Sequence, residues 1–523
     1  MTEDWQADTP RPRYLAAIAA IKRAIARGDT YQVNYTLRLT RPFAGEAWAL
    51  FLAMQQAQQG AYGAFIETPA FAICSASPEL FFTLDGEQLC SRPMKGTAPR
   101  GRHLAADEAN RRWLQHSLKN RAENVMIVDM IRNDMGRVAE IGSVQAPRLF
   151  EVERYPTVLQ MTSSVQARTR AGLIEVLGAL FPCASITGAP KVRTMQIIRE
   201  LEGRPRGVYT GAVGFAAPAG EDAPPRTQFN VAIRTLVVDK AAAQATYGVG
   251  GGIVWDSKGE AEYAECQVKA RILTAPPPVF SLLESLYWHP GGGYWLLQRH
   301  LQRLAAAAIY FVRPLDVEAA RALLLAQADQ LRAQRPAAHK VRLLAGPEGD
   351  LTCEATPILP AQPRRALRLG LAAAPVDATD PFLYFKTTHR RVYEQAGRCQ
   401  QENAVAPGRA PGPAGIAPPA WPGCDDVLLW NERGELTESS RANLVIAWGG
   451  ALLTPPLDCG LLAGVYRGEL LDRGLLREQV IRREMLASAD AIFLINSVRG
   501  WMRAIVERDR LKTAGRAGGD EPV

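Results

Sequence analysis

Three acidic side chains in the first half of the chain have the type and spacing of a metal site. Glu262, Glu265 and Lys269 are spaced i, i+3 and i+7 in a segment of helical periodicity, so they share one helix face. Glu123 lies in a second helical segment, RAENVMIVDMIRND, whose other positions are strongly apolar. Carboxylates from two helices that face one cleft could hold Mg²⁺, which takes oxygen ligands and keeps several waters. Spacing alone also allows a solvated helix face paired with Lys or Arg.

Two further segments of the first half offer a nucleophile and an anion site. Lys95 stands in the turn-like segment RPMKGTAPRG, and an amine held near apolar groups has a lowered pKa and acts as a nucleophile. Residues 187–201, TGAPKVRTMQIIREL, are predicted to form a loop that enters a helix, so free backbone N–H groups near Thr187, Gly188 and Ala189 would bind a carboxylate. A solvated loop lysine and an ordinary helix start remain open as alternatives.

A glycine-rich stretch, YGVGGGIVWD over 247–256, lets a backbone approach a ligand closely. Gly250 and Gly251 are the positions where we expect that approach. The stretch lacks the strand, helix and acidic residue of a dinucleotide site, so it does not predict a nucleotide.

The second half contains a lysine and a glutamate that suit pyridoxal phosphate. Lys386 is predicted to end an aromatic strand, PFLYFK, just before a helix, where an amine could hold the cofactor aldehyde. Glu438 is predicted on the returning arm of a hairpin around Gly434, where a carboxylate could pair with the pyridinium nitrogen. Each residue alone also fits a solvated position.

The elements expected around these residues are mixed α and β. Apolar periodicity predicts helices over 14–26, 107–134 and 258–273 and strands over 71–82 and 229–238. The triple proline at 276–278 ends the first pattern, and a second α/β pattern begins at Phe280. We therefore expect a domain over 1–275, a domain over 279–512 with a mobile Pro/Gly/Ala-rich insertion at about 402–424, and a disordered tail over 513–523.

Composition restricts the class of protein and its ligands. The 523 residues are 47% apolar and 22% charged, as in an ordinary globular enzyme. The net charge of +8 comes without a Lys/Arg block, which favours an anionic small molecule over nucleic acid. Eight cysteines without a CxxC pair, no signal peptide and no apolar run of about 18 residues predict a cytoplasmic protein with free thiols that does not span a membrane.

The order and number of motifs in the first 275 residues resemble the chorismate-utilising enzymes, a family with anthranilate, isochorismate, salicylate and aminodeoxychorismate synthases. The resemblance implies an α+β domain of layered β-sheets with flanking helices. Its motifs are GDTYQVN (28–34), SPELFF (77–82), RPMKGTAPRG (92–101), ENVMIVDMIRNDMGRV (123–138), ITGAPKVRTMQ (186–196), GVYTGAVGF (207–215), FNVAIRT (229–235) and EAEYAECQVKA (260–270).

This resemblance implies a role for each matching residue. Glu123 and Glu265, with Glu262 beside them, match the Mg²⁺ site that also holds the ring carboxylate of chorismate. The ring carboxylate is surrounded by Thr187, Gly188 and Lys269, and the enolpyruvyl carboxylate is bound by Tyr209 and Arg234.

Lys95 separates the subfamilies, because anthranilate synthases have a small residue there and aminodeoxychorismate synthases have lysine. In the latter the amine is thought to attack C2 of the ring as the C4 hydroxyl leaves, and Glu79 matches the acid that assists the hydroxyl. Gln160 stands where pyruvate-eliminating relatives have histidine, and Gln cannot shuttle a proton.

Two features expected of a complete synthase are missing from the sequence. An N-terminal segment of roughly a hundred residues, which usual members of the family carry before the core, is not found. No cysteine stands in a glutaminase-like nucleophile turn, so ammonia would come from a separate glutamine amidotransferase subunit or from free ammonium.

Residues 280–510 resemble fold-type IV pyridoxal-phosphate enzymes, an α/β family of two subdomains that includes aminotransferases and aminodeoxychorismate lyase. The motifs are LLQRHLQRLAAAAIYF (296–311), KTTHRRVY (386–393), GELTESSRANLVI (434–446), LLTPPLDCGLLAGVYRGELL (452–471) and INSVRG (495–500). By position, Lys386 holds the cofactor, Glu438 faces the pyridinium nitrogen and Asn443 lies near the ring. The phosphate cup is expected at Arg303, Val465, Tyr466 and Ser497.

Together the resemblances imply a route from chorismate and ammonia through 4-amino-4-deoxychorismate to 4-aminobenzoate, with Mg²⁺ and pyridoxal phosphate as cofactors and a homodimer through the second domain. Two alternatives remain. One is an anthranilate or salicylate synthase fused to an amino-acid aminotransferase. The other is an inactive first domain beside an active lyase.

Overall fold

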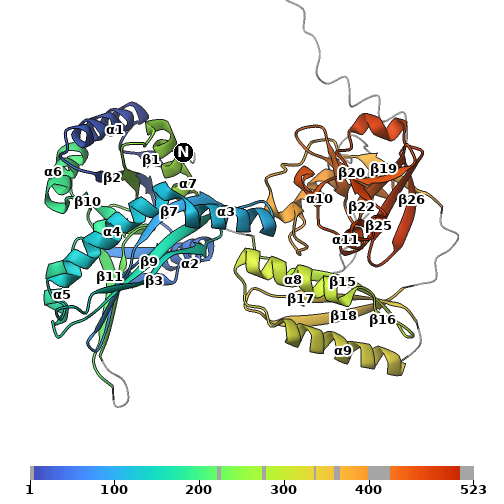
Figure 1. Ribbon diagram of the computed structural model, residues 1–523, viewed down its shortest axis with the longest axis horizontal. Helices are drawn as coiled ribbons and strands as arrows, with labels where there is room; N and C mark the ends of the chain where they lie inside the picture. The colour runs from blue at the N-terminus through green and yellow to red at the C-terminus, as the bar shows by residue number, and fades with distance from the viewer. Residues whose placement is uncertain are drawn as a thin grey trace, which may run out of the picture. The chain divides into compact units, whose positions relative to one another are not determined.

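A computed structural model describes residues 5–220, 225–273, 278–334, 337–358, 365–398 and 424–506, which form two compact units (Figure 1). Unit 1 comprises Met1–Arg100 and Glu108–Pro277, and unit 2 comprises Gly101–Asp107 and Pro278–Val523. The expected insertion lies outside the described residues except at residue 424, and so does the expected tail.

Unit 1 contains two seven-stranded sheets. The first has the order β1-β2-β14-β13-β4-β3, with β10 on β2, and the second has the order β11-β12-β5-β6-β9-β7, with β8 on β9. The first sheet is built from β1 (Gln6–Ala7), β2 (Gln32–Pro42), β3 (Tyr62–Glu67), β4 (Phe71–Ser77), β10 (Gly188–Ala189), β13 (Thr235–Asp239) and β14 (Gln244–Ile253). The second is built from β5 (Leu80–Asp85), β6 (Gln88–Arg92), β7 (Met94–Pro99), β8 (Gln145–Arg154), β9 (Val158–Arg168), β11 (Ala212–Ala217) and β12 (Arg226–Val231).

Helices bury their apolar faces against these sheets, and a separate core lies on each. α1, α2, α6 and α7 pack on the first sheet, and α4 packs on the second. The helices are α1 (Arg11–Ala26), α2 (Ala47–Gln58), α3 (Leu104–His116), α4 (Leu118–Gly136), α5 (Leu173–Leu180), α6 (Lys191–Glu202) and α7 (Gly259–Ala270), with short turns η1 (Ala184–Ile186) and η2 (Arg271–Leu273). This α+β unit of layered sheets agrees with the expected fold class.

Each of the two segments predicted as one strand is two strands, and the two members belong to different sheets. Residues 71–82 break between β4 and β5 at Pro78, which has no N–H to donate to a ladder. Residues 229–238 break between β12 and β13, where Arg234 has a φ of 51°. The predicted single strands were therefore wrong, because alternation of apolar residues does not reveal that a chain changes sheets.

The predicted helix over 107–134 is also two elements, α3 and α4. Ser117 separates them with extended backbone, and its Oγ accepts from the N–H of Asn120 as an N-cap. The break sets the register of α4 independently of α3, and α4 is the helix that carries Glu123.

Unit 2 contains a four-stranded sheet, β16-β15-β17-β18, and an eight-stranded sheet, β21-β20-β19-β26-β25-β22-β23-β24. α8 packs on β15 and α9 on β18, as the yellow-green part of Figure 1 shows. The strands are β15 (Leu282–His289), β16 (Gly293–Tyr294), β17 (His339–Ala345), β18 (Leu351–Pro357), β19 (Leu367–Leu371), β20 (Asp426–Trp430), β21 (Leu436–Ser439), β22 (Asn443–Trp448), β23 (Ala451–Thr454), β24 (Arg477–Glu478), β25 (Ala491–Asn496) and β26 (Gly500–Val506). The helices are α8 (Leu297–Phe311), α9 (Val317–Gln334), α10 (Arg391–Arg398), α11 (Val465–Asp472), η3 (Pro381–Leu383), η4 (Leu457–Cys459) and η5 (Arg483–Ala487).

The aromatic strand predicted before Lys386 is instead the short helix η3 followed by irregular backbone. Pro381 occupies its first turn, and Asp380 caps it by accepting from the N–H of Phe382 at 2.8 Å. The helix expected after Lys386 is present as α10.

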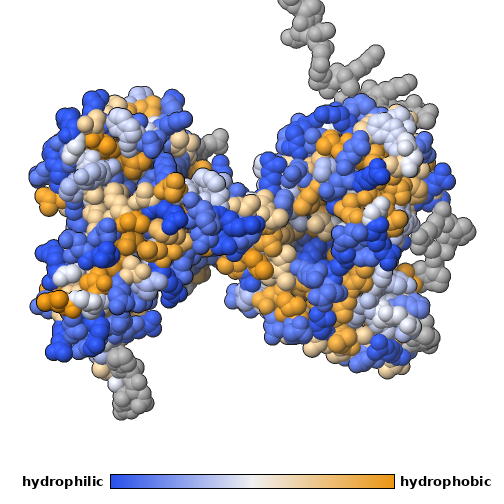
Figure 2. Space-filling model, viewed as in Figure 1, coloured by the Kyte–Doolittle hydropathy of each residue, from blue (hydrophilic) through white to orange (hydrophobic). Residues whose placement is uncertain are grey.

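The helices, surface and cysteines of the described residues bear on the membrane and disulfide expectations. No helix within the described ranges is long and apolar enough to cross a membrane. The face of the molecule in Figure 2 is mostly hydrophilic with scattered apolar patches. The seven cysteines in the described part of the chain are free thiols.

Candidate functional site

Lys95 lies in β7 with its amine directed at the glycine run of β14. A Cβ placed on Gly252 would lie only 2.4 Å from the Nζ of Lys95, so any larger residue there would displace the amine from its present position. The side-chain amide of Asn124 donates to the carbonyl of Lys95 at 3.2 Å and fixes the backbone of this residue. Ser163 in turn donates to Asn124 at 2.6 Å.

The environment of Lys95 lowers the pKa of its amine. Burial is the largest cause, and the positive charge of Lys269 adds to it, while Glu123, Glu79 and Glu265 act in the opposite direction. These five residues come from β7, α4, α7 and the segment before β5, and the structure therefore brings them into one electrostatic neighbourhood.

Glu79 is a buried acid beside the Lys95 strand. Its side chain is 2% exposed, and burial raises its pKa to about 7 despite hydrogen bonds from Ser185 and from the N–H of Met94, at 3.4 Å. A carboxyl with that pKa is partly protonated near neutral pH and can donate a proton to a leaving group.

α7 presents three of the expected residues on one face. The Nζ of Lys269 lies 2.7 Å from Glu265 and donates to the carbonyl of Gly250 at 2.8 Å. A Cβ at Gly251 would lie 3.4 Å from Glu262 and 3.6 Å from the Nζ of Lys269. The glycines of β14 therefore let the polar face of α7 approach the strand closely.

The carboxylates of this site offer the oxygen ligands that Mg²⁺ requires. Burial raises the pKa of Glu262, and the negative charge of Glu265 raises it further. A divalent cation would relieve both effects. Within the described ranges, no three acidic, histidine or cysteine side chains are grouped so that they could hold a metal by themselves. Glu123 and Glu265, whose charges both act on Lys95, are the carboxylates that would hold the ion, with waters and a substrate carboxylate as its remaining ligands.

Arg234 and Tyr209 lie next to α7 and β14. Arg234 adopts a left-handed φ of 51° and donates to the carbonyl of Lys269 at 2.8 Å. The ring of Tyr209 occupies the space over Gly248, where a Cβ would come within 2.1 Å of it. Burial raises the pKa of Tyr209, so its hydroxyl stays protonated and can donate to a carboxylate.

The turn before α6 differs from the expected row of free N–H groups. The N–H of Thr187 donates to the carbonyl of Ala184 at 3.3 Å, and its hydroxyl donates to Cys183 at 3.1 Å. Gly188 pairs with Val33 in the β10–β2 ladder at a φ of +141°. The N–H and hydroxyl of Thr187 are therefore used within the η1 turn. The sequence predicted a loop in which the N–H would be free.

Gln32 is a site residue that the sequence analysis missed. It is fully buried, and neither atom of its amide has a hydrogen-bond partner among the described residues. The amide nitrogen lies 3.2 Å from the Cβ position of Gly252, which also faces the amine of Lys95. The signal was the GDTYQVN motif, which was noted only as a family marker.

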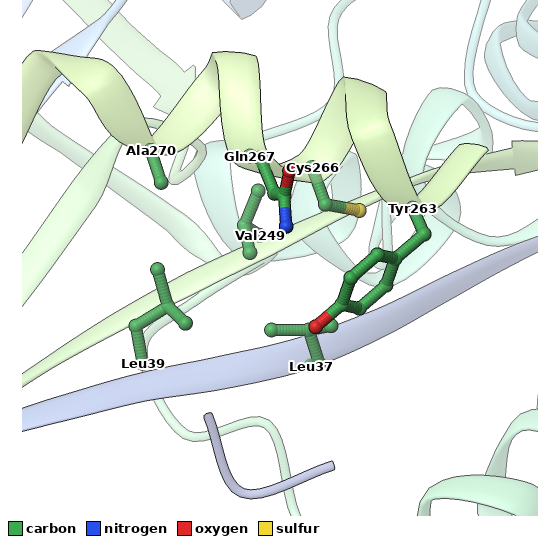
Figure 3. Close-up of a pocket in the computed structure, with 7 residues that line it drawn as sticks. All are labelled: Leu37, Leu39, Val249, Tyr263, Cys266, Gln267 and Ala270. Carbon is green, nitrogen blue, oxygen red and sulfur yellow. The ribbon is translucent and has the colours of Figure 1, made fainter. Parts of the chain in front are cut away.

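A small apolar groove lies on a different face of α7 (Figure 3). Its lining is Leu37, Leu39, Val249, Tyr263, Cys266, Gln267 and Ala270. None of the expected catalytic or metal residues lines it, so the chemistry is assigned to the polar face of α7 and not to this groove.

In unit 2, Lys386 lies in irregular backbone between η3 and α10. The N–H of Leu283 in β15 donates to the carbonyl of Lys386 at 3.0 Å. Burial, and after it the charge of Arg303, lower the pKa of the Lys386 amine to about 8. An amine with this pKa has a large neutral fraction near pH 8 and can attack an aldehyde.

Glu438 is a buried acceptor of three hydrogen bonds. Tyr393 donates to it at 2.8 Å, the N–H of Leu462 at 3.1 Å and the amide of Asn443 at 3.1 Å. Burial raises its pKa to about 7, against the lowering effect of those donors. The structure thus joins Asn443 to Glu438, and it adds Tyr393, which sequence reasoning missed although it ends the motif KTTHRRVY.

Arg303 binds a buried acid that sequence reasoning also missed. Its guanidinium donates to both carboxylate oxygens of Glu284, at 2.8 and 2.7 Å, and to the carbonyl of Ala463 at 3.1 Å. His300 lies 2.6 Å from the same carboxylate. Burial alone would raise the pKa of Glu284, but the charge and hydrogen bonds of Arg303 and His300 hold it at about 2. The Nε2 of His300 is buried without a partner among the described residues.

These groups fit pyridoxal phosphate. α11 begins at Val465 beside Ala463, and its first N–H groups have no intrahelical partner, as a phosphate site requires. Tyr466 packs against Trp295 with ring centroids 4.7 Å apart and the ring planes tilted, and Ser497 is buried. The imidazole of His300 is close enough to Lys386 for the lysine charge to lower its pKa. Its Nε2 has no hydrogen-bond partner among the described residues, so it could bond to a polar group bound beside Lys386.

Comparisons with known proteins match two separate parts of the chain. Residues 1–275 match the family described as chorismate binding enzyme, and residues 422–505 match amino-transferase class IV. Aminodeoxychorismate synthase component 1 from Escherichia coli (strain K12) is 40% identical over 267 residues, which cover 51% of this chain and 57% of that protein. The chain thus spans little more than half the length of that relative.

Two further matches bear on the two halves. Anthranilate synthase component 1 1 from Haloarcula marismortui is 38% identical over 271 residues, covering 51% of this chain and 54% of that protein. A solved structure of a provisionally named amino-acid aminotransferase from Mesorhizobium loti has 33% identity and a TM-score of 0.37, covering 44% of this chain and 100% of that one.

Proposed function

Because the chain belongs to the chorismate binding enzyme family through residues 1–275, we propose that unit 1 converts chorismate and ammonia to 4-amino-4-deoxychorismate. We further propose that unit 2 removes pyruvate from this product and releases 4-aminobenzoate. Overall identity does not separate aminodeoxychorismate from anthranilate synthases, since the two relatives match at 40% and 38%. The observation that carries the proposal is the amine of Lys95 set among the acids of α4 and α7.

The first step follows from the groups around Lys95. The amine, made nucleophilic by burial, forms a bond to C2 of the ring while the C4 hydroxyl leaves as water with the proton of Glu79. Ammonia then forms a bond at C4, and the Lys95 amine departs with its electron pair returned to nitrogen. Mg²⁺, when bound by Glu123 and Glu265 with Glu262 beside them, supplies charge that holds and polarises the substrate.

The substrate carries two carboxylates, and unit 1 has a cationic or donor group for each. Lys269 is assigned to the ring carboxylate, and the turn at Thr187 and Gly188 is assigned to its surroundings but not as a donor, because the donors of Thr187 are used within the turn. Arg234 and Tyr209 are assigned to the enolpyruvyl carboxylate, with Gly250 and Gly251 allowing the approach. Ammonia is supplied by a separate amidotransferase subunit, as the name component 1 of the relatives implies.

In unit 2, the class IV match implies pyridoxal phosphate, which supplies an electron sink when bound. Lys386 would hold the cofactor and carry the proton removed from C4 of the substrate to the enolpyruvyl group that departs as the C3–O bond breaks. Glu438 and Asn443 orient the ring, and Arg303, Val465, Tyr466 and Ser497 hold the phosphate. Pyruvate leaves as the six-membered ring becomes aromatic.

Product analysis by mass tests the whole proposal. The protein is incubated with chorismate, Mg²⁺ and ammonium, with and without pyridoxal phosphate. We expect 4-aminobenzoate with the cofactor and accumulation of 4-amino-4-deoxychorismate without it. Anthranilate as the product would refute the assignment of unit 1. Persistence of 4-amino-4-deoxychorismate in the presence of cofactor would refute that of unit 2.

A further inference from the structure

Gly101–Asp107 follows the strand that carries Lys95, yet it belongs to unit 2. The segment closes on itself, since the N–H of Gly101 donates to Asp107 at 3.0 Å and the N–H of Asp107 donates to the carbonyl of His103 at 2.9 Å. A Cβ at Gly101 would lie 2.0 Å from the backbone nitrogen of Asp107, so only glycine fits there. The loop is therefore compact and holds its side chains in fixed places.

The side chains of this loop lie against Tyr384. The ring of His103 packs on that of Tyr384 with centroids 5.7 Å apart, and its Nε2 lies 3.6 Å from Asp458. Burial raises the pKa of Tyr384, and Arg102 opposes this by its charge and by a hydrogen bond to the hydroxyl. Leu104 adds apolar contact with the core of unit 2.

The backbone of the loop is bound as well. The hydroxyl of Tyr310 donates to the carbonyl of Gly101 at 2.8 Å. The ring of Tyr310 packs on Phe385 with centroids 4.3 Å apart. The loop thus reaches both aromatic residues that directly precede Lys386, one by side chain and one through Tyr310.

Lys386 lies in irregular chain between η3 and α10. Its carbonyl and the residues after it are held to 281–283 by the bond from Leu283, by the isolated bridge between Leu282 and Thr387, and by the N–H of Thr388, which donates to the carbonyl of Ser281 at 2.9 Å. Within the described residues, Tyr384 and Phe385 have no such backbone pairing with a strand. The direction in which its side chain leaves the backbone therefore depends on how the two buried rings before it are packed.

We propose that Gly101–Asp107 positions Lys386 by fixing Tyr384 and Phe385, so that a segment from the synthase half of the sequence completes the second active site. Its members are positioning residues, because they act through the two rings. The role of Lys386 as the residue that holds the cofactor rests on the proposed function. The packing of residues 384–386 by the loop is independent of the proposed function.

His103→Ala in the full chain tests this proposal. We expect faster deuterium exchange of the amides of 384–386 and an affinity for pyridoxal phosphate, followed by absorbance, that is lower by about tenfold, as for a misplaced reactive group. His103→Phe keeps the ring against Tyr384 and should restore both properties. The matched control is His116→Ala, because His116 is exposed at the C-terminal end of α3 and its Nδ1 lies 2.8 Å from the carbonyl of Arg112 in its own helix.

Two outcomes would overturn the proposal. One is exchange and cofactor affinity in His103→Ala equal to those of His116→Ala. The other is a global rise in exchange across unit 2 that His103→Phe does not reverse, which would indicate a stability role only. A second domain that catalysed a different reaction would leave both readouts as expected, so failure of the proposed function is distinguishable.

Discussion

At the scale of single residues, two buried amines are prepared for attack by the same cause. Burial is the largest cause of the lowered pKa of both Lys95 and Lys386. Each amine also has a buried acid in its neighbourhood with a pKa near 7, Glu79 in unit 1 and Glu438 in unit 2. A lowered pKa increases the neutral, nucleophilic fraction of each amine at a given pH, and a carboxyl with a pKa near 7 keeps a protonated fraction near neutral pH.

Lys95→Ala removes the nucleophile proposed for unit 1. We expect the synthase rate to fall by at least about a hundredfold, since covalent catalysis by the amine is lost. The lyase rate on supplied 4-amino-4-deoxychorismate should not change. Chorismate consumption and 4-aminobenzoate formation, measured separately by chromatography, check this. A variant that still makes 4-amino-4-deoxychorismate at the normal rate would exclude Lys95 as the nucleophile.

The pH dependence of the first step follows from Glu79. The acid works in its protonated form, and burial raises its pKa to about 7, so the synthase rate should fall as pH rises through about 7. Glu79→Gln cannot donate a proton and should be nearly inactive at all pH values. The rate is measured from pH 6 to 9 with saturating ammonia, because the fraction of neutral ammonia also rises with pH. A rate that is flat over this range would contradict the role of Glu79.

At the scale of elements, the glycine run of β14 decides how closely side chains approach the sheet. Gly252→Ala places a methyl group 2.4 Å from the starting position of the Lys95 amine, which must move. We expect the synthase rate to fall by about tenfold or more, as for a displaced reacting group, with little loss of thermal stability. Gly178→Ala in α5 is the control, because nothing lies within 4 Å of its Cβ position. Equal rates in both variants would show that the amine is not confined there.

Sequence patterns revealed the types of most elements but not where the chain changes direction. Residues 71–82 alternate like one strand, yet Pro78 divides them between two sheets. The break at Ser117 was hidden because serine is tolerated within helices and its capping role depends on its backbone conformation. Local periodicity carries no information about which sheet a strand joins.

The site residues also differ in whether the sequence alone can reveal them. Lys95, Glu79 and the acids of α7 could be selected because motif positions mark them. Gln32 and Glu284 could not, since a buried amide and a buried acid stand out only when their partners are known in space. The free N–H groups expected at Thr187 also depended on the turn that the chain forms there.

At the scale of the whole molecule, each unit contains its own core and its own set of reactive groups. Under the proposed function, the intermediate passed between the two reactions is a small molecule, so the two steps need no shared side chain. A mixture of Lys95→Ala and Lys386→Ala proteins should therefore form 4-aminobenzoate from chorismate and ammonium, although each protein alone should not. Product is followed by fluorescence over time, with the order of addition varied. Lack of product from the mixture, when each variant retains its remaining single step, would mean that the intermediate must be transferred within one chain.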